Sequence, residues 1–376
     1  MGRHDTSAER VRLTGAYGAA PRSRAWVLLV IAIPLLLAGA IPSPYAIERP
    51  GPVVDTLGEV RIDGKSQPVV SFADAKTYPT TGRLNLLTVQ ILGSPDRQRS
   101  WLSLVPALFD PSQRIAPLSD FFVEGQTSED RDAQNTVLMA SSQSTAAAAA
   151  FRELDEPVSE VLTVAQIAPE SAADGVLQQG DVLTTLDGEP LADFAMLRER
   201  TMQAGDGGVL KLGIERDGEK RSVEVEPSVP EGGDEPLIGA TISISYDLPS
   251  EVDVKLEDIG GPSAGMVFSI AMVDQLTPGD LLGGMTVSGT GTMSGDGEVG
   301  PIGGLEQKMW AASRADSDLF LMPLGNCADL PDRIPERVRI APVATLSEAI
   351  DAVETAASGG TPAGVERCGA ATAAPQ

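Results

Sequence analysis

The segment that decides the fold of the second half of this chain is GGPSAGMVFSI, residues 260–270. A Gly-Gly-Pro turn leads into Ser263, and Ala264 and Gly265 then open an apolar run that is typical of a helix. Ser263 is therefore expected at the mouth of a helix, between residues too small to block access to its hydroxyl. Such a serine is either a helix cap, a role that serine favours, or an exposed nucleophile.

A serine nucleophile needs a base, and the one histidine of the chain, His4, lies ahead of a predicted membrane segment. Lysine can replace histidine if burial lowers its pKa enough to leave a neutral amine near pH 7. Lys308 is the best candidate among the lysines, because it lies in PIGGLEQKMWAA, where a glycine pair opens a helix rich in apolar side chains. Other serines, including Ser141 and Ser142, are interpreted as structural.

An uncharged segment near the N-terminus, WVLLVIAIPLLLAGAI (26–41), predicts a membrane anchor. Four arginines precede it, so the positive-inside rule places the N-terminus in the cytoplasm and the rest of the chain outside. A cleaved signal peptide is the alternative, with Ala38-Gly39-Ala40 as the cleavage site. An extracytoplasmic location favours a disulfide between Cys327 and Cys368 over two ordinary thiols.

The net charge of the chain limits the classes of partner that it can bind. Lys+Arg 28 against Asp+Glu 53 gives a net charge of -25, which argues against nucleic acid as a partner. No phosphate-binding loop of the GxxxxGK[ST] type is present, so nothing in the sequence indicates ATP use. No cofactor and no metal ion are expected.

Residues 157–229 form a separable module. Its hallmark is APESAADGVLQQGDVLTTLDGEPL (168–191), which predicts a short helix, a Gly-Asp turn and an Asp-Gly hairpin in that order. The order resembles a PDZ domain of the bacterial protease-associated type. No Gly-Leu-Gly-Phe-like carboxylate-binding loop precedes Val161, so the resemblance does not by itself imply capture of a peptide C-terminus.

The serine and lysine motifs together resemble the proteolytic domain of Lon-type serine proteases, which use a Ser-Lys dyad. GGPSAG (260–265) matches the nucleophile motif, and GTGTMSGDGEVGPIGGLEQK (289–308) matches the lysine motif. The resemblance runs from about residue 238 to 353 and reaches back to GRLNLLTVQI (82–91) as a first strand. Anchor, PDZ-like module and Lon-like domain together resemble the membrane-anchored, PDZ-containing Lon-like proteases of bacteria.

This resemblance implies an α+β fold: a Lon-type proteolytic domain with an inserted PDZ-like domain and one N-terminal transmembrane helix. The expected organisation is a cytoplasmic tail (1–24), an anchor (25–47), the first part of the protease region (48–156), the PDZ-like domain (157–229), the Lon-like proteolytic domain (230–356) and a flexible tail (357–376). Lon-like domains often form rings, so a homo-oligomer is compatible with the resemblance.

The resemblance also implies a function. The expected activity is that of an ATP-independent serine endopeptidase that cleaves unfolded or flexible extracytoplasmic protein segments. Ser263 is expected to attack and Lys308 to take the proton, while the oxyanion and substrate site is expected to involve Gly261, Pro262, Ala264 and Thr290. The alternative is a membrane-tethered PDZ scaffold or regulator whose protease-like domain is inactive.

Overall fold

The computed structural model describes residues 39–62, 64–230, 232–256, 259–335 and 338–371, together with Trp26, Val30 and Ile33. The predicted cytoplasmic tail and most of the predicted anchor lie outside these residues. Among the residues described, no helix is both long enough and apolar enough to cross a membrane. The last residues assigned to the anchor, Tyr45 to Ile47, are instead the start of a β-strand.

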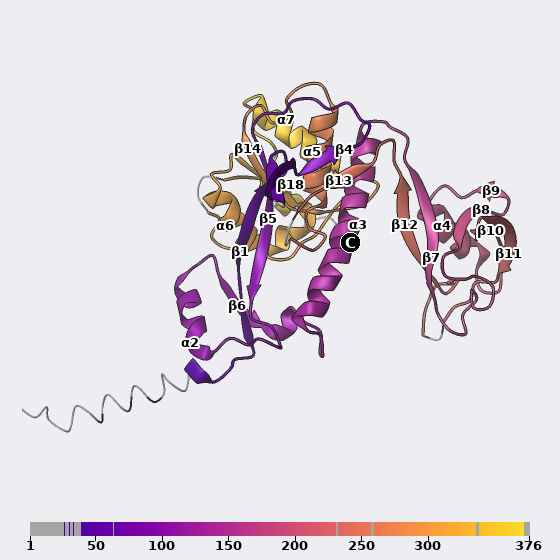
Figure 1. The fold of residues 1–376 in the computed structure, drawn as a ribbon, viewed down its shortest axis with the longest axis horizontal. Helices are drawn as coiled ribbons and strands as arrows, with labels where there is room; N and C mark the ends of the chain where they lie inside the picture. The colour runs from indigo at the N-terminus through magenta and orange to yellow at the C-terminus, as the bar shows by residue number, and fades with distance from the viewer. Residues whose placement is uncertain are drawn as a thin grey trace, which may run out of the picture.

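A mixed six-stranded sheet, in the order β18-β17-β14-β5-β1-β6, forms the centre of the protease region (Figure 1). The first four strands of this order are parallel to one another, and β1 and β6 are antiparallel to their neighbours. The strands are β1 (Tyr45–Asp55), β5 (Arg83–Leu92), β6 (Arg114–Pro117), β14 (Thr286–Gly289), β17 (Leu319–Pro323) and β18 (Arg339–Val343).

Strand β1 includes the segment IERPGPVVD, which contains two prolines. Proline cannot donate a ladder hydrogen bond, so it argues against a strand at the middle of a sheet. The register between β1 and β5 shifts between Pro50 and Val53, which accommodates the prolines in an irregular ladder. The predicted strand at GRLNLLTVQI is β5, and it lies between β1 and β14.

Helices cover both faces of this sheet. Alternate residues of β17 point to opposite faces, as the pleat requires: Leu319 and Leu321 belong to the main core, whereas Phe320 and Met322 belong to a second core. The main core includes α5 (Gly265–Leu276) and α7 (Leu346–Ala357), and the second includes α6 (Leu305–Arg314). The ends of the parallel strands therefore lie between two layers of helices, where side chains from both layers can meet.

A long helix, α3 (Ser128–Glu153), packs along α5. It begins at Ser128, where Thr127 and Asp130 form a reciprocal capping box. Its alanine run is buried, and the small side chains allow close approach to α5, where Ser269 Oγ donates a 2.9 Å hydrogen bond to the carbonyl of Ala146. Shorter elements complete this part: β2 (Glu59–Ile62), β3 (Lys65–Pro68), β4 (Val70–Phe72), α2 (Trp101–Leu104), β13 (Val252–Val254), β15 (Thr292–Met293), β16 (Val299–Gly300) and α8 (Glu366–Ala371).

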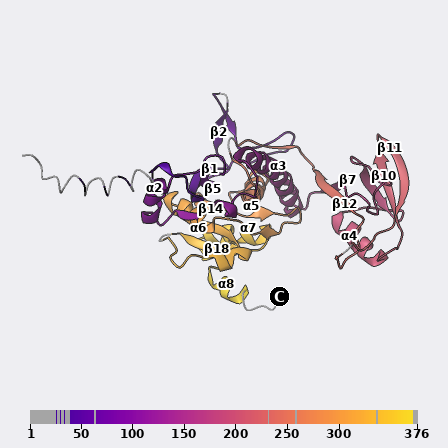
Figure 2. The ribbon, with the colours of Figure 1, turned by 90° about the horizontal axis from the view of Figure 1, so that it is seen from below.

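The PDZ-like module lies beyond α3 (Figure 2). Its sheet follows the path β11-β10-β8-β7-β12, with β9 paired to β8. The elements are β7 (Ser159–Ile167), β8 (Val182–Leu186), β9 (Glu189–Pro190), α4 (Phe194–Ala204), β10 (Leu210–Arg216), β11 (Glu219–Val225) and β12 (Ala240–Asp247). The short helix expected after β7 is a series of turns.

Strand β12 corrects the predicted boundary of the PDZ-like domain. The segment IGATISISYDL was assigned to the Lon-like domain, but β12 pairs antiparallel with β7 from Ala240 to Asp247. The sheet of the module therefore continues well past residue 229, and β12 is its edge strand. Alternation within one strand cannot reveal which sheet the strand joins, because that depends on distant partners.

The two cysteines form a disulfide, Cys327–Cys368. It connects α8 to the short helical segment Leu324–Asp329 that follows β17. The start of the segment expected to be a flexible tail is thereby attached to the body of the protease region.

Candidate active site

The nucleophile segment and the lysine segment meet at the end of β14. Ser263 Oγ lies 3.0 Å from Lys308 Nζ. Helix α5 begins at Gly265, and its N-cap residue is Ala264, which makes no side-chain capping bond. Ser263 is therefore not the helix cap, and its half-buried hydroxyl faces the lysine amine instead. This geometry removes the alternative interpretation of the serine.

Lys308 occupies the buried face of α6, where Leu305, Met309 and Ala312 are also buried. Only 2% of its surface is exposed. Burial lowers the pKa of Lys308 to about 7, because a charged amine is poorly solvated there, while the nearby carboxylate of Glu48 acts in the opposite direction. A large fraction of the amines is thus neutral at neutral pH and able to accept a proton.

The carboxylate of Glu48 does not restore the ordinary pKa of Lys308, because it is already paired with Arg114. Its carboxylate receives a 2.7 Å hydrogen bond from Arg114 Nε, across the β1–β6 ladder. Within the part of the chain that the structure describes, Lys308 forms no salt bridge with any carboxylate. The amine is left with two hydroxyl partners, Ser263 and Thr290.

Thr290 orients the amine. Lys308 Nζ donates to Thr290 Oγ1 at 3.0 Å, and the Thr290 hydroxyl in turn donates to the carbonyl oxygen of Ser263 at 3.2 Å. With its own proton committed to that carbonyl, the hydroxyl can only accept from the amine. One N–H of Lys308 is thereby held by Thr290, which leaves the lone pair of the neutral amine available to Ser263. Thr290 itself is fully buried.

Two glycines allow the segments to approach so closely. A Cβ at Gly265 would lie 2.8 Å from Met293 Cβ, in the segment that follows Thr290. Gly304, the N-cap of α6, has φ of 67°, and a Cβ there would lie 2.6 Å from a methyl group of Val89. A larger residue at either position would push α5 or α6 away from the site.

Helix α3 holds the backbone just before Ser263, a role that the sequence did not indicate. The amide of Gly261 donates to the carbonyl of Asn135 at 2.9 Å, and Ser142 Oγ donates to the carbonyl of Pro262 at 3.0 Å. Ser142 is buried, and its hydrogen bond gives it a specific structural role. It positions the turn that presents Ser263.

The other predicted site residues surround Ser263. Within the described residues, the backbone amides of Ser263 and Ala264 donate no internal hydrogen bond, so both are free for a developing oxyanion. The carbonyl of Ser263 is held by the amide of Gly291 at 3.0 Å. No cluster of three or more His, Cys, Asp or Glu side chains in the described part of the chain is arranged to hold a metal ion.

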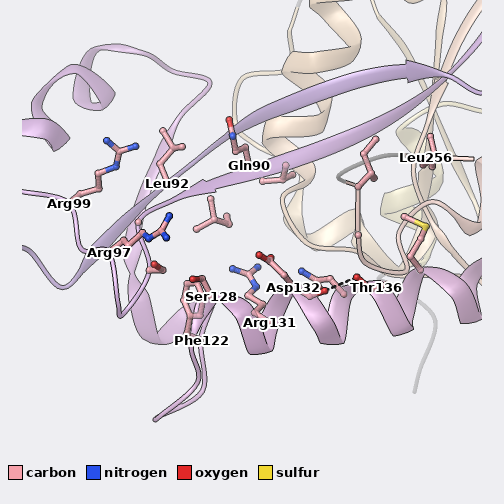
Figure 3. A pocket seen from close by; sticks show the side chains of 18 of the residues that line it. Gln90, Leu92, Arg97, Arg99, Phe122, Ser128, Arg131, Asp132, Thr136 and Leu256 are labelled. Atoms are coloured by element: carbon pink, nitrogen blue, oxygen red, sulfur yellow. Dashed lines mark hydrogen bonds between the residues drawn. The ribbon is translucent and has the colours of Figure 1, made fainter. Parts of the chain in front are cut away.

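A groove of about 1140 Å³ lies between β5 and α3 (Figure 3). Gly260, three residues before Ser263 along the chain, is among its lining residues. Strand β5 pairs with β14 only from Arg83 to Leu86, so within the described residues its edge along Leu87–Leu92 has no strand partner on the groove side. Sequence periodicity identified β5, but it could not show that half of one edge is unpaired.

The region that holds both side chains matches the family model of the Lon protease (S16) C-terminal proteolytic domain, over residues 257–357. A model of the PDZ domain matches residues 131–226. The chain carries a Lon-type proteolytic domain and a PDZ domain. The match to the Lon-type domain includes Ser263, Thr290 and Lys308, and the PDZ match ends after β11, ahead of the edge strand β12.

The curated relatives that match this chain are named Lon proteases. The Lon protease of Rhizobium meliloti is 30% identical over 184 residues, which are 46% of this chain and 22% of that protein. The Lon protease of Geobacter metallireducens is 30% identical over 168 residues, 44% of this chain and 20% of that protein. The chain thus spans about a fifth of the length of these relatives. Among solved structures, the PDZ domain of an SdrC-like protein from Listeria innocua is 18% identical, with a TM-score of 0.21, over 22% of this chain and 92% of that one.

The segment that leads into the edge strand of the PDZ sheet follows β11 in the chain. The strand beside β7 is β12, so the loop that precedes the edge strand comes after β11 rather than before Val161. Leu237-Ile238-Gly239 leads directly into β12. An apolar-apolar-glycine step before an edge strand is the signal that could have identified this segment, had the order of strands in the sheet been known.

Proposed function

We propose that this chain is an ATP-independent serine endopeptidase in which Ser263 is the nucleophile and Lys308 the general base. The observation that carries the proposal is the 3.0 Å separation of Ser263 Oγ from the buried amine of Lys308. A neutral amine at hydrogen-bond distance can take the serine proton, which is the requirement for attack by an otherwise weak nucleophile.

The proposed reaction uses the two side chains in both halves of the cycle. Ser263 Oγ attacks the peptide carbonyl carbon as its proton moves to Lys308 Nζ. The protonated amine then delivers that proton to the leaving nitrogen, and the C–N bond breaks to leave an acyl-enzyme. Water attacks the ester with Lys308 again as base, which restores Ser263. The free amides of Ser263 and Ala264 stabilise the oxyanion that forms at each step.

The groove supports unfolded or flexible segments as the substrate class. A peptide can reach Ser263 along the unpaired edge of β5 only as an extended strand, because a strand edge binds backbone that has no partner of its own. A folded protein does not offer such a segment unless a loop or terminus is free. The sequence contains no ATP-binding loop that would indicate an unfolding motor.

The location proposed for the reaction is the outer side of a membrane, with the chain anchored by the apolar segment 26–41. This part of the proposal rests on the uncharged apolar segment and on the arginines before it. The Cys327–Cys368 disulfide supports it, since disulfides persist in oxidising compartments.

The PDZ domain is proposed to recruit protein or peptide partners at the edge of β12. That strand pairs with β7 on one side only, and within the described residues its other edge has no strand partner. Leu237, at the mouth of this edge, is half exposed at 51%. An extended peptide can add to such an edge by main-chain hydrogen bonds.

Covalent labelling tests the proposed nucleophile. The full chain, purified in detergent, is treated with a peptidyl phosphonate, which reacts with an activated serine. Ser263→Ala and Lys308→Ala should both abolish labelling and the cleavage of an unfolded casein substrate. Two exposed residues on β11 provide matched controls, and Ser222→Ala and Lys220→Ala should label like the wild type.

The alternative, a PDZ scaffold with an inactive protease-like domain, predicts a different result. In that case the wild type neither labels nor cleaves, and both site variants restore the phenotype of a deletion strain as well as the wild type does. That outcome would reject the proposed activity.

A further inference from the structure

The charge of the groove is opposite to that of the chain. Three arginines line it, and the carboxylate among its lining residues is that of Asp132 (Figure 3). Arg97 and Arg99 come from the loop after β5, and Arg131 comes from the first turn of α3. The chain as a whole has 53 acidic and 28 basic residues, so a cationic wall beside the candidate active site is a departure from its composition.

These arginines are not neutralised by firm internal partners. Arg97 Nε lies 3.9 Å from Asp96, in a pair whose side chains are 88% and 39% exposed, and such pairs contribute little. Within the described part of the chain, Arg99 and Arg131 form no salt bridge. Arg131 is held instead by the ring of Phe122, at 4.8 Å from the ring centroid. Its guanidinium is thereby fixed at the groove; the carboxylates of Asp132 and Glu48 lie near enough to act on its charge, but neither forms a salt bridge with it.

The distance from Arg131 to Ser263 can be counted along α3. Asn135 is hydrogen-bonded to Gly261, and Ser142 to Pro262, so this part of the helix runs beside the nucleophile turn. Arg131 lies one turn before Asn135, about 6 Å at 1.5 Å per residue, and about 16 Å before Ser142. An extended peptide advances about 3.3 Å per residue, so Arg131 lies roughly two to five substrate residues from the scissile bond, and Arg97 and Arg99 line the same groove.

We propose that Arg97, Arg99 and Arg131 make this groove select substrate segments with Asp or Glu about two to five residues from the cleaved bond. The inference rests on the proposed peptidase function, and it adds the chemical class of the preferred sequence. A carboxylate entering the groove gains charge-assisted hydrogen bonds to guanidinium groups that have no firm anionic partner. The planar fork of Arg131, held on Phe122, supplies a preorganised site for a carboxylate.

Matched peptides test the selection. Fluorogenic peptides share one cleavable core and carry Asp, Asn or Lys at the second to fifth positions on one side of it, with a second set for the other side. For the full-length wild type, kcat/KM should be about tenfold or more higher for the Asp than for the Asn peptide on one of the two sides, and lowest for Lys. The preference should fall about threefold for each arginine changed to Gln, and it should weaken as salt rises from 50 to 500 mM.

Substitutions separate charge from packing. Arg131→Lys keeps the charge but not the planar fork, so it should retain part of the Asp-to-Asn ratio, more than Arg131→Gln and less than the wild type. Arg198→Gln removes an exposed arginine of the PDZ domain that pairs with Glu235, and it should leave the ratio unchanged. If the ratio falls equally in this control, the effect is one of overall charge, and the assignment to the groove is wrong.

A binding measurement keeps the inference separate from the activity. Anisotropy of the same labelled peptides on Ser263→Ala should show tighter binding of the Asp peptide. If the wild type cleaves Asp and Asn peptides equally and Ser263→Ala binds them equally, the inference fails and the peptidase proposal stands. If Ser263→Ala prefers the Asp peptide but the wild type cleaves nothing, the peptidase proposal fails while the acidic selectivity of the groove stands.

Discussion

Lys308 Nζ lies 3.0 Å from the hydroxyl of Thr290, which is itself hydrogen-bonded to the carbonyl of Ser263. One threonine thus links the proposed base to the backbone of the proposed nucleophile. Thr290 also follows directly after β14, at the end of the parallel strands, so its position is set by the sheet. The orientation of the amine is therefore determined by the central sheet as well as by its own helix.

Thr290→Val should lower kcat about 10- to 100-fold, because one hydrogen bond to a charged or reacting amine is worth roughly 1.5 to 3 kcal/mol. The lost acceptor also stabilised the protonated amine, so the midpoint of the pH profile should move to lower pH. Thr290→Ser keeps the hydroxyl and should recover most of the rate. Steady-state kinetics of the three proteins across pH would contradict this role if the serine and valine variants behaved alike.

Peptidase activity should rise with pH through a midpoint near 7. The pKa of Lys308 is lowered to about 7 by burial, and only the neutral amine can accept the proton of Ser263. Below the midpoint kcat/KM should fall about tenfold per pH unit, and above about pH 8 it should level off. The measurement is kcat/KM for one neutral peptide in constant-ionic-strength buffers. A profile that is flat between about pH 5 and about pH 9 would exclude a lysine base.

Lys308→Met should abolish activity and stabilise the fold. The pKa of Lys308 lies below its ordinary value, so the unfolded chain binds more protons and the wild type loses stability as pH falls from about 10.5 toward 7. An apolar side chain of similar length removes that cost, by roughly 2 to 4 kcal/mol at pH 7. Urea unfolding should show a larger gain at pH 6 than at pH 9. The matched control is Lys220→Met, at an exposed position, which should show neither effect.

Asp274→Asn should also stabilise the protein at neutral pH, without touching the dyad. Asp274 is buried in α5, its Oδ1 accepts a 3.0 Å bond from the amide of Leu281, and its Oδ2 has no partner among the described atoms. Burial raises the pKa of Asp274 to about 6, so the wild type loses stability as pH rises through about 4 to 6.

Asparagine at position 274 can still accept from Leu281 through its amide oxygen and carries no charge. The gain should be about 1 to 3 kcal/mol at pH 7.5 and should nearly vanish at pH 4.5. Thermal unfolding at the two pH values measures it. An equal change at both would show that the carboxylate is not ionised at a cost in the folded state.

Much of the candidate site could be predicted from local pattern. Lys308 was identified because it lies among apolar residues on one helix, and Ser263 because small residues precede and follow it. Both signals are short-range, since they depend on helical periodicity and on residue size. By contrast, Asn135 and Ser142 act through contacts with residues more than a hundred positions away, and nothing in their own neighbourhood indicates that role.

The sequence alone determined the pairing of a serine motif with a lysine motif, the PDZ-like order of turns, and the two cysteines available for a disulfide. Only the tertiary structure decided that a proline-rich segment is a central strand, that β12 belongs to the PDZ sheet, and that three arginines face one groove. The physical reason is that strand partners and charge clusters are set by contacts between residues distant in the chain. A local pattern records which face of an element is buried, but it does not record what covers that face.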